Sequence, residues 1–422
     1  MNHCCTRRQF LARAGALGVL AAGAGPVLQS RSIAADKLPM AEAFDREVEQ
    51  FMSARKVPGG ALAVVKDQRL VYARAYGWAD REKQAPVKPD SLFRIASVTK
   101  PFTATAVLKL VESKGLDLDT PVTEFLPLKP VLVNGKTADP RWKRVTLRHC
   151  LHHTGGWDRD VSGDPMFRSL ETARAVGVPA PANAQAIIRY MLGQPLDFDP
   201  GARYAYSNFG YCLLGRVIER LGSRPYEQFV REEVLAPMGI RRMRLGASLE
   251  SGRIEGEVRY YTPDNSEGSS VFPGLPAKVP EPYGSFCIEA MDAHGGWLAS
   301  APDLARFAAI LDTPEGSTCL KPDTRRILYE PPAPPASRNP DGSLAGHFYG
   351  CGWVVRAVGK EGTAGYWHNG SLPGTSTLLF RRLDGISWAV LFNQRSESSS
   401  LPDKAIEPAL NRAADAVERW PG

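Results

Sequence analysis

Four short motifs that identify common enzyme classes are missing from this 422-residue sequence. It has no G-x-S-x-G, G-x-G-x-x-G, G-x-x-x-x-G-K or H-E-x-x-H, which argues against an α/β-hydrolase, a dinucleotide-binding enzyme, a P-loop nucleotidase and a zinc protease of that type. Cysteine is scarce as well, with seven residues and no C-x-x-C spacing, so neither a zinc ribbon nor a dense disulfide framework is indicated. The content of 43% hydrophobic and 23% charged residues is typical of globular proteins and excludes wholesale disorder.

The sequence also lacks a long apolar run, and the short one near its start indicates export. That run spans residues 14–28, which is shorter than the roughly 20 apolar residues that a membrane helix requires. Arg7-Arg8 precedes it and small residues at 33–35 follow it, an order that resembles a twin-arginine signal peptide over residues 1–35. We therefore expect a periplasmic or secreted protein with no stable membrane span in the mature chain. The alternative is a basic, disordered N-terminus.

Little net charge is left once this segment is set aside. Residues 1–35 hold four arginines and no acidic residue, so the formal net charge of +7 less these four leaves +3 for the rest. Such a near-neutral chain argues against a nucleic-acid partner. Two of the seven cysteines also lie in this segment. The remaining five are Cys150, Cys212, Cys287, Cys319 and Cys351, and because five is an odd number at least one of them is free.

Predicted strands lie at both ends of the chain, and predicted helices dominate its middle. Runs of β-forming residues between turn signals predict strands over 61–65, 70–74, 375–381 and 386–393. Apolar residues at helical spacing predict helices over 40–56, 97–114, 211–221, 225–234, 303–311 and 403–419.

This order predicts an α/β (α+β) fold with one antiparallel sheet built from both chain ends and flanked by helices. We expect a single domain over 36–422. Its α/β part would cover about 36–110 and 286–422, and a mostly helical insertion would cover about 111–285.

The first candidate for chemistry is Ser97-x-x-Lys100. A serine and a lysine three residues apart share one helix face, so the amine can reach the hydroxyl. A desolvated lysine can act as the base that such a nucleophile requires. The pattern alone is weak, because Ser53-x-x-Lys56 repeats it at a predicted helix C-terminus. Ser97 instead begins a helix, where an N-cap serine is the alternative interpretation.

Two further motifs supply the remaining groups that acyl transfer requires. Tyr206-x-Asn208 precedes a predicted helix, and a phenol beside a lysine can shuttle protons while an amide orients it. His368-x-Gly370 leads into a predicted strand pair, where a cation or donor and a close backbone approach could form the far wall of a site. Competing H-x-G matches at His153 and His294 lead into no strand pair.

These three motifs, in this order and at these separations, resemble the serine β-lactamase and penicillin-binding protein superfamily. The Y-x-N form is similar to its class C branch, which also holds DD-peptidases and carboxylesterases. The resemblance covers about residues 40–416. Four flanking segments agree with it: Phe93 to Ala96, Thr146 to Gly156, Pro200-Gly201 and Gly295 to Leu298.

The resemblance implies the β-lactamase/transpeptidase-like fold and a role for each motif residue. Ser97 would be the acylated nucleophile, and Lys100 with Tyr206 would supply its base and the acid for the leaving group. Asn208 would contact the substrate and Lys100. The backbone N–H groups of Ser97 and Ser371, with His368 and Gly370 beside them, would bind the substrate carbonyl. Which of Lys100 and Tyr206 takes the first proton stays open.

One residue departs from the β-lactamase pattern. His368 stands where true β-lactamases and many DD-peptidases carry lysine. A neutral imidazole binds a substrate carboxylate less strongly than an ammonium group does. This difference argues for an esterase or amidase over a β-lactamase.

Two further groups of residues could belong to a site. Four residues form a dense histidine and cysteine cluster that could suggest zinc: His149, Cys150, His152 and His153. Family members have histidines at similar places in a structural turn, so we expect no metal and no cofactor. Aromatic residues of the long loops could line the cleft or could pack in the core: Trp157, Tyr260, Tyr261, Phe272 and Tyr283.

We therefore predict an exported serine hydrolase acting on a small ester or a D-amino-acid peptide or amide. The first alternative is a DD-carboxypeptidase or a class C-like β-lactamase, whose substrate would be a β-lactam or a D-amino-acid peptide. The second is a penicillin- or peptidoglycan-binding protein without turnover.

Overall fold

The computed structural model describes residues 38–132, 137–311, 319–333, 346–356, 365–395 and 403–421. The predicted signal peptide over 1–35 lies outside the described residues. Residues Lys37–Gly422 form one compact unit. Within the described ranges, no helix is both long and apolar enough to cross a membrane.

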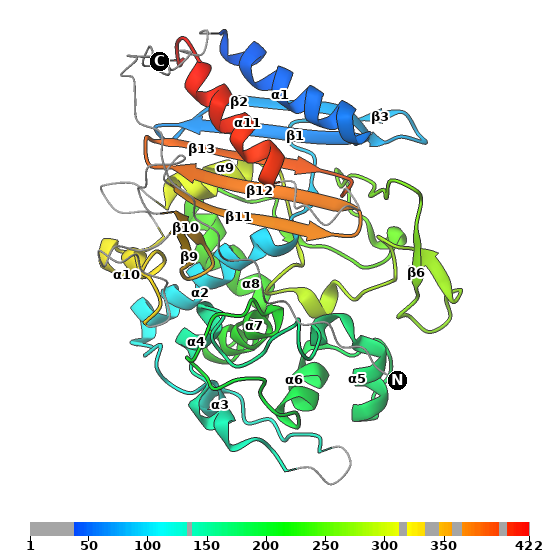
Figure 1. The fold of residues 1–422 in the computed structure, drawn as a ribbon, viewed down its shortest axis with the longest axis vertical. Coiled ribbons are helices and arrows are strands. Elements are labelled where there is room, and N and C mark those ends of the chain that lie inside the picture. The colour runs from blue at the N-terminus through cyan, green and yellow to red at the C-terminus, as the bar shows by residue number, and fades with distance from the viewer. Residues whose placement is uncertain are drawn as a thin grey trace, which may run out of the picture. The chain divides into compact units, whose positions relative to one another are not determined.

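An eight-stranded antiparallel sheet joins the two ends of the chain (Figure 1). Its strand order is β3-β2-β1-β13-β12-β11-β10-β9, so β1 from the N-terminal part pairs directly with β13 from the C-terminal part. The prediction of one sheet built from both chain ends is confirmed. The bounds of the strands are Gly59–Lys66 (β1), Arg69–Asp80 (β2), Ala85–Pro86 (β3), His347–Tyr349 (β9), Val354–Arg356 (β10), Gly365–Leu372 (β11), Thr375–Arg382 (β12) and Ile386–Phe392 (β13).

Both faces of the central strands are covered, which explains why β12 and β13 are buried along their whole length. Alternate residues of β1 belong to different cores, with Ala61 and Ala63 on one face and Leu62 and Val64 on the other. Helices α1 (Met40–Arg55) and α11 (Asp403–Ala416) lie side by side over the second face (Figure 1). Helix α9 (Ala301–Ile310) packs against β1, β12 and β13.

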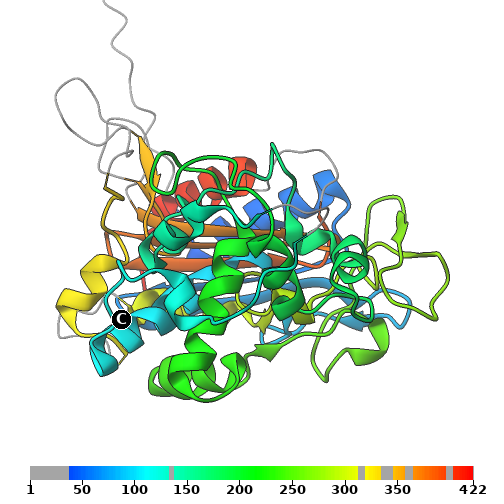
Figure 2. The same cartoon turned by 90° about the horizontal axis from the view of Figure 1, so that it is seen from below.

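The helical part lies on the side of the sheet away from α1 and α11, and in Figure 2 it stands in front of the strands. Helix α2 (Thr99–Lys114) leads from the sheet into it and is capped by Gly115, whose φ of 63° is left-handed. The α-helices of the insertion that follow before residue 231 are α3 (Val122–Phe125), α4 (Leu147–Leu151), α5 (Ser169–Val176), α6 (Ala184–Leu192), α7 (Asn208–Gly222) and α8 (Tyr226–Val230).

The predicted helix over 211–221 starts three residues earlier in the structure. Ser207 caps α7 by accepting a hydrogen bond from the backbone N–H of Gly210 at 3.4 Å. Asn208 is therefore the first residue of α7, and its side chain is fixed by the helix start.

The later part of the insertion is mostly loop. After a π-helical turn over Arg231–Leu235 it contains the short strands β5 (Arg244–Leu245), β6 (Glu267–Ser269) and β7 (Lys278–Pro280). Strand β8 (Trp297–Ala299) lies between β5 and β4 (Phe93–Arg94) in a small second sheet, and α10 (Pro322–Ile327) follows α9.

Candidate active site

Ser97 lies where the small sheet meets the first turn of α2. Strand β4 ends at Arg94, and Ser97 follows in the 3-10 turn Ala96–Val98 that opens the helix. Ala96 has a φ of 47°, a left-handed conformation that is costly for a residue with a Cβ. Neighbouring contacts must therefore hold this turn in place.

Strand β12 holds the segment before Ser97 through two threonine side chains. Thr375 Oγ1 donates to the Arg94 carbonyl at 2.7 Å, and Thr377 Oγ1 donates to the Ile95 carbonyl at 2.9 Å. Gly370 of β11 packs closely against the same segment. A Cβ at this position would lie only 2.1 Å from the Ile95 carbonyl oxygen, so a larger residue would not fit. This glycine thus lets the sheet approach the nucleophile turn, whereas the sequence pattern predicts a close approach of substrate at this position.

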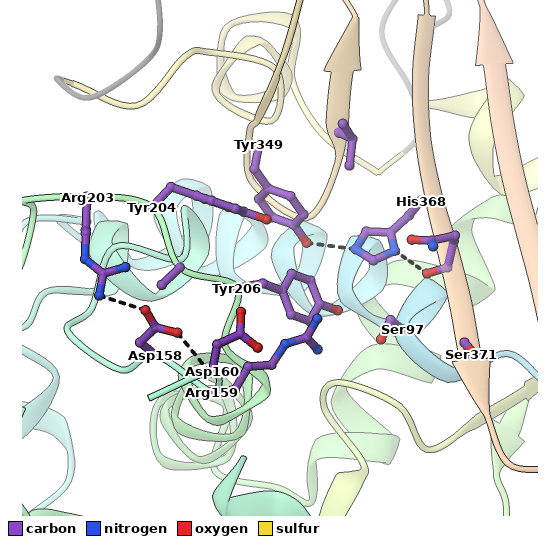
Figure 3. Close-up of a pocket in the computed structure, with 13 residues that line it drawn as sticks. Ser97, Asp158, Arg159, Asp160, Arg203, Tyr204, Tyr206, Tyr349, His368 and Ser371 are labelled. Atoms are coloured by element: carbon purple, nitrogen blue, oxygen red, sulfur yellow. Dashed lines mark hydrogen bonds and ion pairs between the residues drawn. The ribbon is translucent and has the colours of Figure 1, made fainter. Parts of the chain in front are cut away.

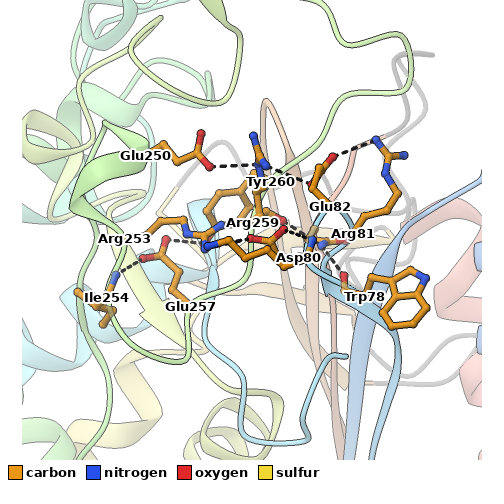
Figure 4. A network of polar contacts seen from close by, with 12 residues as sticks. Trp78, Asp80, Arg81, Glu82, Glu250, Arg253, Ile254, Glu257, Arg259 and Tyr260 are labelled. Carbon is orange, nitrogen blue, oxygen red and sulfur yellow. Dashed lines mark hydrogen bonds and ion pairs between the residues drawn. The ribbon is translucent and has the colours of Figure 1, made fainter. Parts of the chain in front are cut away.

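A buried arginine anchors β4 on the other side. The Arg94 guanidinium donates to the carbonyls of Pro282 at 2.6 Å and Ala247 at 2.7 Å, and it lies 4.3 Å from the Tyr260 ring centre. Tyr260 accepts from the Arg94 backbone N–H at 2.8 Å and donates to Glu257 at 2.8 Å. The loop that carries Glu257 is in turn tied to β2 and the residues after it, through the ion pairs Arg253–Asp80 and Arg259–Glu82 (Figure 4).

Lys100 is fully buried, and its amine contacts three oxygen atoms. Nζ lies 3.1 Å from Ser97 Oγ, 2.8 Å from Asn208 Oδ1 and 3.1 Å from the His294 carbonyl oxygen. Burial holds the pKa of Lys100 well below its usual value. Lys100 can therefore lose its proton more readily than a free lysine and present a neutral amine to the serine hydroxyl.

Tyr206 covers the same amine from the cavity side. Its ring centre lies 4.7 Å from Lys100 Nζ, and both Tyr206 and Ser97 line the same cavity. Burial raises the pKa of Tyr206 above that of a free phenol. The phenol is therefore protonated at neutral pH, and it can donate a proton to an atom at Ser97.

Asp164, which belongs to none of the three sequence motifs, lies behind Asn208. Asn208 Nδ2 donates to Asp164 Oδ2 at 2.6 Å, while Asn208 Oδ1 faces Lys100. Asp164 thus fixes the orientation of the amide. Its carboxyl also caps the next turn by accepting from the Met166 N–H at 3.0 Å, and burial raises its pKa. The only sequence signal was an Asp-Pro pair, which is typical of an ordinary helix start.

Replacing Asp164 with Asn tests its electrostatic part. The variant keeps an oxygen that can accept from Asn208 but removes a negative charge that favours the ammonium form of Lys100. We expect the acid limb of kcat/KM to move to lower pH by on the order of one pH unit. A pH profile with a chromogenic ester measures this. Asp199→Asn removes an exposed carboxylate paired with Arg141 and serves as the control. A shift to higher pH in D164N would contradict the assignment.

His368 lines the cavity as a neutral ring with both nitrogens engaged. Nδ1 donates to the Asn369 carbonyl at 2.7 Å, so Nε2 accepts from the Tyr349 hydroxyl at 2.9 Å (Figure 3). Burial and the nearby Lys100 lower the pKa of His368 to about 3. In this arrangement His368 presents neither a charge nor a free N–H to the cavity, because Nδ1 is bonded to the Asn369 carbonyl and the Tyr349 hydroxyl occupies Nε2.

The cavity in front of Ser97 has a volume of about 520 Å³. Ser371 of β11 lies on the wall opposite Tyr206, as Figure 3 shows. The other lining residues include three loop residues after α4, the loop before α7, and residues of β9 to β11: Asp158, Arg159, Asp160, Arg203, Tyr204, Ala205, Tyr349, Val354, His368 and Asn369.

The aromatic residues proposed for the cleft lie elsewhere. Trp157 packs against Trp142 and Phe209 in the core, and Tyr260 with Tyr283 surrounds Arg94. Tyr204 and Tyr349 line the cavity instead. Their neighbours in the sequence carry no periodic pattern that would have identified them.

The histidines in and just after α4 have structural partners. His149 forms a capping box with Thr146 at the start of α4. His152 Nδ1 lies 3.1 Å from the Tyr349 carbonyl oxygen, and His153 Nδ1 accepts from the Ser207 N–H at 3.2 Å. Across the ranges that the structure describes, no three His, Cys, Asp or Glu side chains are grouped to hold a metal ion. The five cysteines after residue 36 are buried.

A cavity-lining serine beside a buried lysine, with a tyrosine over the lysine amine, is the arrangement of a serine hydrolase. Comparison with known proteins supports this class. A model of the beta-lactamase family matches residues 44–410. Esterase EstB of Burkholderia gladioli is 29% identical over 398 residues, which cover 89% of this chain and 96% of the esterase.

One further relative is a penicillin-binding protein, and a solved structure with the same fold is an amidase. Penicillin-binding protein 4* of Bacillus subtilis (strain 168) is 26% identical over 361 residues, which cover 85% of this chain and 72% of that protein. The D-amino acid amidase of Ochrobactrum anthropi SV3 shares the fold with a TM-score of 0.66 at 23% identity, over 89% of this chain and 98% of the amidase. The chain therefore belongs to the beta-lactamase family of serine hydrolases.

Proposed function

We propose that this protein is an exported hydrolase that forms an acyl-enzyme on Ser97 and cleaves an ester or amide bond. The geometry of Lys100 carries the proposal. A neutral lysine amine has two N–H donors and one lone pair. Asn208 Oδ1 and the His294 carbonyl accept from the two N–H groups, so the lone pair faces Ser97 Oγ at 3.1 Å.

The first half of the reaction follows from these positions. Lys100 takes the proton of Ser97, and Oγ attacks the substrate carbonyl carbon. The backbone N–H groups of Ser97 and Ser371 stabilise the negative oxygen that forms. When the carbonyl re-forms, the bond to the leaving group breaks and Tyr206 donates its proton to the departing oxygen or nitrogen. Tyr206 then regains a proton from the Lys100 ammonium, which restores both groups.

Water completes the cycle along the same path. Lys100 and Tyr206 together remove a proton from the attacking water, which adds to the acyl carbon. The Ser97–acyl bond breaks, and Oγ regains its proton. His368 has no charge to offer a substrate carboxylate at the position where β-lactamases carry lysine, and this difference, with the likeness to esterase EstB, supports an ester or amide substrate over a β-lactam.

Mass spectrometry of the mature protein tests this proposal. With a p-nitrophenyl ester at low pH, where deacylation is slow, we expect a mass increase equal to one acyl group, located by digestion to the peptide that holds Ser97. Labelled penicillin is the second reagent. Rapid turnover of penicillin would favour the β-lactamase alternative, and a stable adduct without product from any reagent would favour the binding protein. An acyl group on a residue other than Ser97 would overturn the mechanism.

A further inference from the structure

Arg159 is a cation on the cavity wall that the proposed mechanism does not use. It is exposed, and its guanidinium lies 4.9 Å from the ring centre of Tyr206. Figure 3 shows the guanidinium pointing past Tyr206 toward Ser97. Stacking on an aromatic ring orients a guanidinium without occupying its N–H donors.

The other cations of the cavity are already engaged. Arg203 pairs with Asp158 at 2.7 Å, and Lys100 is buried behind Tyr206 with three oxygen contacts. His368 carries no charge, since both ring nitrogens are bonded as in a neutral imidazole. Among the described residues, no carboxylate forms an ion pair with Arg159.

We propose that Arg159 binds a carboxylate of the substrate on the leaving-group side of the scissile bond. The inference rests on the proposed function, in which Tyr206 protonates the leaving group, because the Arg159 guanidinium lies against that ring. A guanidinium presents two parallel N–H donors that match the two oxygens of a carboxylate. The substrate class is therefore an ester or amide whose leaving group bears an acid, such as a carboxylated phenol or the C-terminal residue of a peptide.

Asp160 lies on the same wall and opposes this binding. Its carboxylate is exposed beside Arg159 in Figure 3, while its backbone N–H donates to Asp158 at 2.9 Å. A nearby negative charge weakens the attraction between Arg159 and an anionic substrate. Replacing Asp160 with Asn is therefore expected to improve the use of a carboxylated substrate, which a purely structural role of this residue would not do.

Two matched phenyl esters test the assignment, 3-acetoxybenzoate and the neutral 3-acetoxybenzamide. The readout is the ratio of kcat/KM for the carboxylate to that for the amide, because general damage to the site cancels in this ratio. We expect Arg159→Gln to lower the ratio about tenfold to hundredfold and Asp160→Asn to raise it. Arg203→Gln removes the same charge from the same cavity and is expected to change the ratio by less than about threefold.

The outcomes separate this inference from the proposed function. Hydrolysis of neither ester by the unaltered protein, with no acyl group on Ser97, would overturn the proposed function. Hydrolysis of both esters with an unchanged ratio in Arg159→Gln would overturn the inference alone. An equal loss in Arg203→Gln would assign the effect to the cavity charge as a whole and would also overturn it. A monoester of succinic acid places the carboxylate on the acyl side, and selective loss of that substrate in Arg159→Gln would contradict the stated side.

Discussion

Replacing Ser97 with Ala is expected to lower the rate of p-nitrophenyl acetate hydrolysis by about 10⁴-fold to 10⁶-fold, as removal of a serine nucleophile does in other hydrolases. The loss is this large because the lysine and tyrosine then have no hydroxyl to activate. The change itself is small, since alanine suits the start of a helix and Ser97 caps no backbone N–H in this turn. Initial rates measured against the unaltered protein at equal folded concentration give the result.

The second S-x-x-K of the chain provides a matched control. Ser53 lies on the exposed side of α1, and Lys56 ends that helix in a left-handed conformation. Ser53→Ala is therefore expected to stay within about twofold of the parent, as surface substitutions usually do. If Ser97→Ala retained a tenth or more of the parent rate, an acyl-enzyme on Ser97 would be excluded.

The contrast between these two serines shows how much of the site can be predicted from the sequence. Their motifs are identical in pattern, but a strand precedes Ser97 and a helix ends at Lys56, so the flanking residues alone are enough to distinguish them. The order of Ser97, Tyr206 and His368 along the chain likewise predicts that one fold brings them together. The pairing of β1 with β13 follows from the apolar strands at both ends, and the structure confirms it.

The residues that the sequence did not predict act through contacts between distant segments. Asp164 lies 44 positions from Asn208, and Tyr349 lies 19 positions from His368. Neither partner belongs to a motif, and each changes the chemistry of the residue it contacts: Asp164 orients an amide, and Tyr349 fixes a neutral imidazole. Protonation states depend on such contacts and on burial, and a local sequence motif predicts neither of them.

Replacing Lys100 with Met has the second large expected effect, a fall in kcat/KM of about 10²-fold to 10⁴-fold, the usual contribution of a general base. Methionine has similar length and suits a buried site, so the variant removes the amine with little change in volume. Rates with p-nitrophenyl acetate over a range of pH provide the measurement. The unaltered protein should gain activity as Lys100 loses its proton, with an apparent pKa below the usual lysine value because burial lowers the pKa of this amine.

The same profile decides between the two candidates for the first base. Burial raises the pKa of Tyr206 and lowers that of Lys100, so at neutral pH the amine is the group closer to losing its proton and the phenol is the group that keeps it. Lys100→Met should therefore abolish the rising acid limb. Tyr206→Phe should keep that limb, and its loss of rate should be larger for esters with poorer leaving groups. Lys100→Arg, which retains a positive charge but cannot lose it, should resemble Lys100→Met. An acid limb that survives in Lys100→Met and disappears in Tyr206→Phe would transfer the role of first base to the tyrosine.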